Sequence, residues 1–123
     1  MPNTEQFPLV FERLKEILKV NEPNLRVLED RDGKYELLGQ YSKKFKKDLW
    51  YGKVEIGKNY VSYHLMPVYF FPDLLDDISD ELRKHMQGKS CFNFTQVDEG
   101  LLAELASLTS RSVERVRESD ILE

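Results

Sequence analysis

Residues 50–66 read WYGKVEIGKNYVSYHLM, and this stretch decides the fold. Its two halves, Trp50–Ile56 and Tyr60–Met66, alternate in side-chain character on either side of Gly57-Lys58-Asn59. Successive side chains of a strand point to opposite faces of a sheet, so the pattern predicts an antiparallel hairpin. One side of the first strand is expected to carry Trp50, Gly52, Val54 and Ile56.

Further strands are predicted on both sides of this hairpin. Upstream, Leu25–Glu29 and Lys34–Gly39 flank Asp32-Gly33, a dipeptide that supplies the positive backbone angles of a tight hairpin turn. Downstream, Ser90–Thr95 alternates, with Cys91, Asn93 and Thr95 facing away from the two phenylalanines. The sheet is therefore expected to have five strands.

Three helices complete the prediction. Apolar residues recur every three or four positions from about Glu5 to Val20, with Thr4 as the expected N-cap. A second helix is expected to begin at Ser79 and end before Gly88, and Asp98 is expected to cap the last one. The predicted order is α-β-β-β-β-α-β-α. It describes a two-layer α+β fold, with helices on one face of a mainly antiparallel sheet.

Composition limits the class of protein. The chain has 123 residues, 41% hydrophobic and 33% charged, which is typical of one folded domain spanning residues 1–123. A single cysteine and the lack of a signal-like apolar start favour a cytoplasmic protein. The net charge of -4 argues against nucleic acid as a partner, and no run is apolar enough for a membrane span.

The element order also occurs in a known family. Together with the segments Trp50–Gly52, Tyr63–Pro67 and Gly88–Phe94, it resembles the YdhG-like group of small bacterial domains of unknown function. The resemblance covers nearly the whole chain and implies a fold related to type III secretion chaperones. Some relatives are described as frataxin-like iron chaperones, which implies iron binding as one function to consider here.

Side chains that could bind a partner gather in the strands and just beyond them. If helices cover one face of the sheet, the other is free for a peptide, a second subunit or a small ligand. Core packing explains many of these aromatic rings equally well. The residues expected to line a groove on the free face are Trp50, Tyr60, Tyr63, His64, Tyr69 and Cys91.

Two chemical alternatives also follow from the residues. Asp73, Asp76, Asp77 and Asp80 have spacings that could converge carboxylates on a cation, although a solvated acidic surface is the simpler interpretation. Cys91 or His64 could act in catalysis, but a buried thiol and a hydrogen-bonded strand histidine are more usual. His85 is expected to be a cation at the end of the second helix.

The leading hypothesis is a non-enzymatic binding module that needs no cofactor. It would use the free sheet face for an unknown protein or small-molecule partner, and a homodimer is one such arrangement. A frataxin-like iron carrier using the four aspartates is the alternative. A thiol or histidine enzyme is the third hypothesis.

Overall fold

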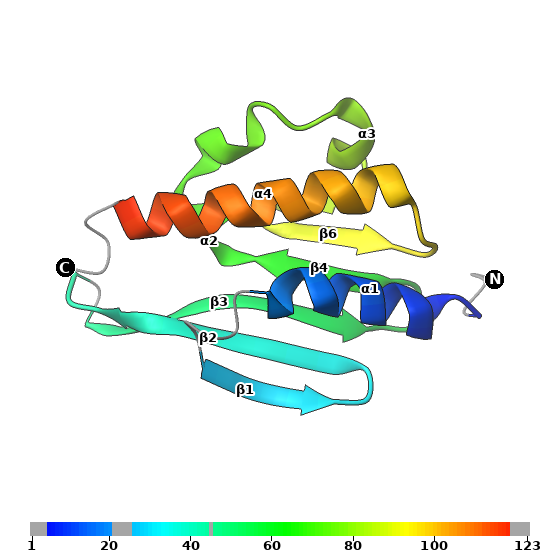
Figure 1. Cartoon of the computed structure of the whole chain (residues 1–123), viewed down its shortest axis with the longest axis horizontal. Helices are drawn as coiled ribbons and strands as arrows, with labels where there is room; N and C mark the ends of the chain where they lie inside the picture. Colours follow the sequence, from blue (N-terminus) through cyan, green and yellow to red (C-terminus); the bar gives the residue numbers. More distant parts are fainter. Residues whose placement is uncertain (1–4, 21–25, 45, 119–123) are drawn as a thin grey trace.

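The computed structural model describes residues 5–20, 26–44 and 46–118, and it shows an α+β protein with one sheet (Figure 1). In chain order the elements are α1 (Phe7–Lys19), β1 (Arg26–Arg31), β2 (Lys34–Ser42), β3 (Lys47–Ile56), β4 (Val61–Leu65), α2 (Met66–Phe70), the 3-10 helix η2 (Pro72–Leu75), α3 (Asp80–Arg83), β5 (Met86–Gln87), β6 (Cys91–Phe94) and α4 (Glu99–Glu118).

Within the described residues, the sheet is antiparallel and has six strands in the order β1-β2-β3-β4-β6-β5. The prediction of five strands was wrong because the helix expected from Ser79 to Gly88 stops after one turn. Ser79 does cap that turn, its hydroxyl accepting from the Leu82 N–H at 3.1 Å. The chain then turns at Gly88, with φ of 76°, and β5 pairs with β6. Strand β5 therefore lies where the rest of the helix was predicted, and the observed order of elements differs from the predicted one.

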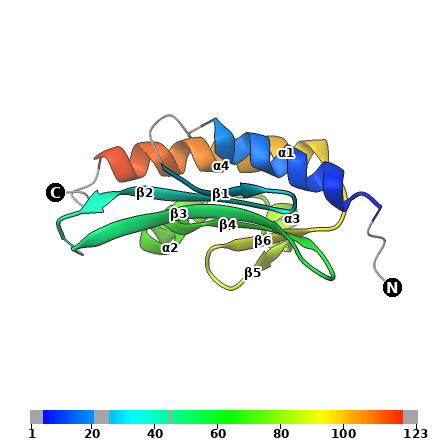
Figure 2. The ribbon, with the colours of Figure 1, turned by 90° about the horizontal axis from the view of Figure 1, so that it is seen from below.

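The two long helices lie side by side on one face of the sheet (Figures 1 and 2). The segment that follows α2 and contains η2 and α3 runs along the side of α4 that is opposite α1 (Figure 1). No helix among the described residues is long and apolar enough to cross a bilayer.

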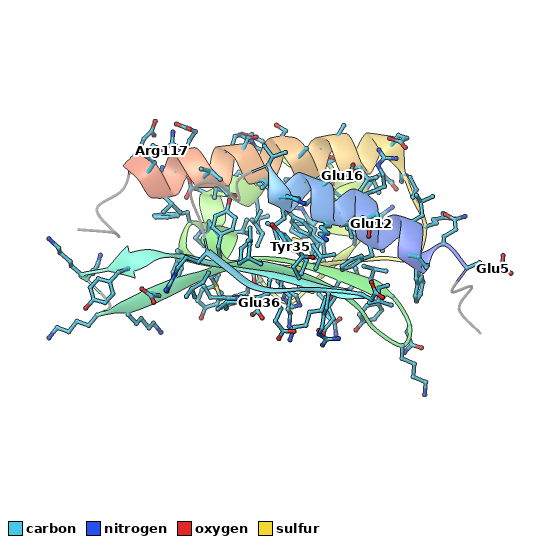
Figure 3. The ribbon with its side chains drawn as sticks, turned by 60° about the horizontal axis from the view of Figure 1, so that its bottom comes forward. Glu5, Glu12, Glu16, Tyr35, Glu36 and Arg117 are labelled. Carbon is cyan, nitrogen blue, oxygen red and sulfur yellow. The ribbon has the colours of Figure 1, made fainter. Side chains whose placement is uncertain are left out.

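The hydrophobic core fills the space between the sheet and these helices. The apolar stripe of α1 is buried as predicted, and Leu105 and Leu108 of the neighbouring α4 are fully buried as well. From the sheet, alternate residues point into the core. Figure 3 shows Tyr35 directed toward α1, whereas its neighbour Glu36 projects from the opposite face. The sheet thus has a core face and an open face.

The predicted turns and caps are largely confirmed. Asp32 and Gly33 form the β1–β2 turn, where Arg31 pairs with Lys34 and Gly33 has φ of 80°. Asp98 caps α4 by accepting from the Leu101 N–H at 3.1 Å. Thr4 and the predicted strand start at residue 25 lie outside the described residues. Helix α1 begins at Phe7 with Gln6 as its N-cap, so the prediction of Thr4 as the cap was wrong.

Candidate functional site

A β-bulge in β3 decides which side chains reach the open face. Leu37 of β2 lies opposite Gly52, but Leu38 lies opposite Trp50, so Tyr51 is an extra residue in the ladder. The bulge directs Tyr51 into the core, where it is 6% exposed. The predicted alternation, which placed Trp50 on the same side as Gly52, was therefore wrong at this position.

Trp50 is fixed on the open face by two neighbours. Its indole Nε1 donates to Glu36 Oε2 at 2.8 Å. Its ring centroid lies 5.8 Å from that of His64, with the two planes tilted by 53°. The partly buried indole therefore has one defined orientation, which limits the conformational entropy that binding would cost.

The neighbouring strands continue this polar surface. His64 of β4 lies opposite Cys91 of β6, and the Cys91 Sγ is 3.6 Å from His64 Nε2. The thiol is also positioned to donate to Asn93 Oδ1 at 3.4 Å. Gln87 Oε1 accepts from Asn93 Nδ2 at 2.8 Å and from the Tyr60 hydroxyl at 3.1 Å.

These side chains form a connected set that crosses the open face from β2 to β5. We call it the open-face cluster: Glu36, Trp50, Tyr60, His64, Gln87, Cys91 and Asn93. Lysine and glutamate side chains flank it, with Lys34 Nζ 3.0 Å from a Glu29 oxygen and Lys53 Nζ 3.4 Å from a Glu55 oxygen. The open face is therefore mostly polar and carries both signs of charge.

The electrostatics of the cysteine–histidine pair oppose ionisation. Burial, followed by the nearby Lys53 charge, lowers the pKa of His64. Burial raises the pKa of Cys91, and Lys53 only partly offsets this effect. Both groups are thus mainly neutral at pH 7. A neutral thiol beside a neutral imidazole is suited to hydrogen bonding rather than nucleophilic attack.

The predicted groove residues separate into two groups. Trp50, Tyr60, His64 and Cys91 do gather on the open face. Tyr63 does not, because it is fully buried on the core face. Tyr69 belongs to a different surface, on α2.

Sequence reasoning missed three members of the cluster. Asn93 and Gln87 bond to each other, and Glu36 binds the indole. Asn93 and Cys91 are two residues apart in β6 and therefore share one face of the strand, so the alternation could have predicted Asn93 as a member of the cluster. Gln87 carried no such signal because β5 was not predicted.

The other candidate residues have structural partners or stand apart. The Asp73 carboxylate forms a salt bridge with Arg115, with Oδ1 3.4 Å from a guanidinium nitrogen. Asp76, Asp77 and Asp80 are exposed. Across the described residues, no three histidine, cysteine, aspartate or glutamate side chains gather closely enough to hold a metal ion. His85 follows α3 rather than ending a long helix. Its ring stacks on Phe94 with the ring centroids 4.7 Å apart, and its Nδ1 lies 2.8 Å from the Asn93 carbonyl oxygen.

Comparison of the chain with protein-family models, with curated proteins and with solved structures finds no match. The arguments for function therefore rest on the geometry of the open face and of the surfaces around it.

Proposed function

We propose that this protein is a non-enzymatic binding module that engages a partner protein through the open face of its sheet. The observation that carries the proposal is the position of Trp50, which a bulge turns away from the core and which Glu36 and His64 hold in place. The predicted YdhG-like relationship and cytoplasmic location form part of the same proposal.

An oriented tryptophan is well suited to a protein interface. Tryptophan is enriched among the residues that carry most of the binding energy in such interfaces, and it is most effective when surrounded by groups that exclude water. Here the ring has Glu36 and His64 beside it, with charged pairs at the margin. The donors and acceptors of the cluster come from β2, β3, β4, β5 and β6 and from Tyr60, which directly precedes β4. Such breadth favours an extended protein surface over a small ligand.

The cysteine–histidine pair favours a second candidate, a thiol enzyme. The Sγ–Nε2 distance of 3.6 Å is close enough for proton transfer in a slightly tightened geometry. Against this candidate, the pKa of the thiol is raised and that of the imidazole is lowered. Asn93 also contacts the thiol and not the imidazole that it would have to orient. We therefore rank binding above catalysis.

Site-specific photo-crosslinking tests the proposal. A photoreactive amino acid replaces Ser62, which lies on the open face between the β3 and β6 partners of β4. The matched control carries it at Ser107, an exposed position on α4. After irradiation in the native cells, an adduct is expected from position 62 and not from position 107. Mass spectrometry then identifies the partner, and an adduct with a second copy would indicate a homodimer.

Purified components give the quantitative measurement. Trp50→Ala is expected to weaken binding of the identified partner about thirtyfold, which corresponds to about 2 kcal/mol for an interface hot spot. Thermal unfolding of the variant checks that the fold is intact. Equal adducts from both positions, no adduct from position 62, or unchanged affinity in a folded Trp50→Ala protein would each contradict the proposal.

A further inference from the structure

A second surface, separate from the open-face cluster, contains a hollow of about 620 Å³. It lies between the segment formed by α2 and η2 and the turn that joins β5 to β6. Its walls include Tyr69, Pro72, Leu75 and Met86. Small-molecule sites usually have volumes of about 300–1,000 Å³ and mostly apolar walls, and this hollow fits both descriptions.

The charges at this hollow have one sign. Arg83 and Lys89 line it, and no acidic residue does. Neither cation takes part in the salt bridges of the described residues, whereas Lys84, next to Arg83 in the chain, lies 3.3 Å from Glu81. In a chain with a net charge of -4, two cations that form no salt bridge among the described residues give this apolar hollow a local preference for anions.

Both cations are held near the walls. One guanidinium nitrogen of Arg83 donates to the Leu75 carbonyl at 2.7 Å, and the other N–H groups stay available for an anion. Lys89 Nζ lies 5.9 Å from the centroid of the Tyr69 ring, a cation–π contact. Because that ring is 52% exposed, it also offers an apolar surface beside the ammonium.

From this arrangement we infer that the hollow binds a small molecule with one anionic headgroup and an apolar body, such as an aromatic or aliphatic carboxylate. The headgroup would accept from Arg83 and Lys89, and the body would cover Leu75, Met86 and Tyr69. A sugar phosphate fits less well, since its hydroxyl groups would face apolar walls without hydrogen-bond partners. The inference does not depend on the proposed protein partner.

Fluorescence titration with 1-anilinonaphthalene-8-sulfonate tests the inference, because this probe joins an aromatic body to one anionic group and brightens in apolar sites. Saturable binding of one probe per chain is expected, with displacement by decanoate. The neutral analogue N-phenyl-1-naphthylamine has the same body without the sulfonate. It should bind at least about tenfold more weakly, as expected when charged hydrogen bonds are lost.

Variants connect the signal to the two cations. Arg83→Gln with Lys89→Gln should weaken the sulfonate probe at least about tenfold, and Lys84→Gln should leave it unchanged. Lys89→Gln alone, at an exposed position, keeps the test valid if the double variant unfolds; it should also weaken binding. Trp50→Ala should not affect the probe, which separates this hollow from the open face. Equal binding of the neutral analogue, no displacement by decanoate, or full affinity in a folded Lys89→Gln protein would overturn the inference.

Discussion

A buried hydrogen bond between the hydroxyl groups of Tyr63 and Thr109 joins β4 to α4. The two oxygens are 2.7 Å apart, and Thr109 Oγ1 also donates to the Leu105 carbonyl at 2.9 Å. Thr109 has one hydroxyl proton and uses it for Leu105, so Tyr63 must be the donor in the shared bond. Tyr63 is fully buried, so water could not take the place of the Thr109 hydroxyl as its acceptor.

Thr109→Val removes that acceptor without changing the size of the side chain. We expect it to lower the free energy of unfolding by about 1–3 kcal/mol, the cost of a buried donor without a partner. Tyr63→Phe should cost less, about 0.5–1.5 kcal/mol, because Thr109 keeps its bond to Leu105. Adding Tyr63→Phe to Thr109→Val removes the unsatisfied hydroxyl, so the double variant should be more stable than Thr109→Val alone.

Urea unfolding of all four proteins, followed by circular dichroism, measures these differences as a double-mutant cycle. The order of the two single variants is the sensitive result. If Tyr63→Phe costs as much as Thr109→Val, or if the two effects simply add, the direction assigned to the hydrogen bond is wrong.

Three further predictions concern backbone packing, the thiol and pH. A Cβ on Gly52 would lie 2.7 Å from the His64 carbonyl oxygen, so Gly52→Ala should cost about 1–3 kcal/mol in urea unfolding, whereas the exposed helical Gly100→Ala should be neutral or slightly stabilising. Cys91 should react with iodoacetamide at pH 7 more slowly than it does in the urea-unfolded chain, because burial raises its pKa; equal rates would contradict this. Burial also raises the pKa of Tyr51 and Tyr63, so both should stay protonated in the folded protein while they ionise in the unfolded chain above about pH 10. Stability should therefore fall as pH rises above that value, less steeply in Tyr63→Phe.

Local patterns predicted most of the fold. The apolar spacing of α1 and the Asp32-Gly33 turn act over a few residues, so the sequence alone locates them. After Ser79, the observed structure differs from the helix that the local sequence predicts. Its capping residue and first-turn acids favour a helix, but Met86 and Gln87 pair with β6 instead. That choice depends on a strand that is available only in the folded sheet, which propensity does not reveal.

The candidate site was predicted in part for a related reason. Parity along β4 and β6 correctly placed His64 and Cys91 on one face, because those strands are regular. Tyr63 was assigned to the groove for its aromatic character, although its parity within β4 is that of the buried Val61 and Leu65. Trp50 reaches the open face only because of the bulge at Tyr51. A two-residue period cannot anticipate a bulge, since the extra residue inverts every side chain beyond it.

The backbone of β4 positions side chains on both the open face and the core face of the sheet. In β4, Tyr63 points inward to Thr109 and the next residue, His64, points outward to Trp50 and Cys91. The carbonyl oxygen of His64 also lies close to Gly52, where a Cβ atom would be only 2.7 Å from it. A larger residue at position 52 would clash with this carbonyl, and a shift of β4 that removed the clash would also move the His64 imidazole. Core packing therefore fixes the position of His64, and a partner that binds the open face would meet a surface already close to its bound geometry.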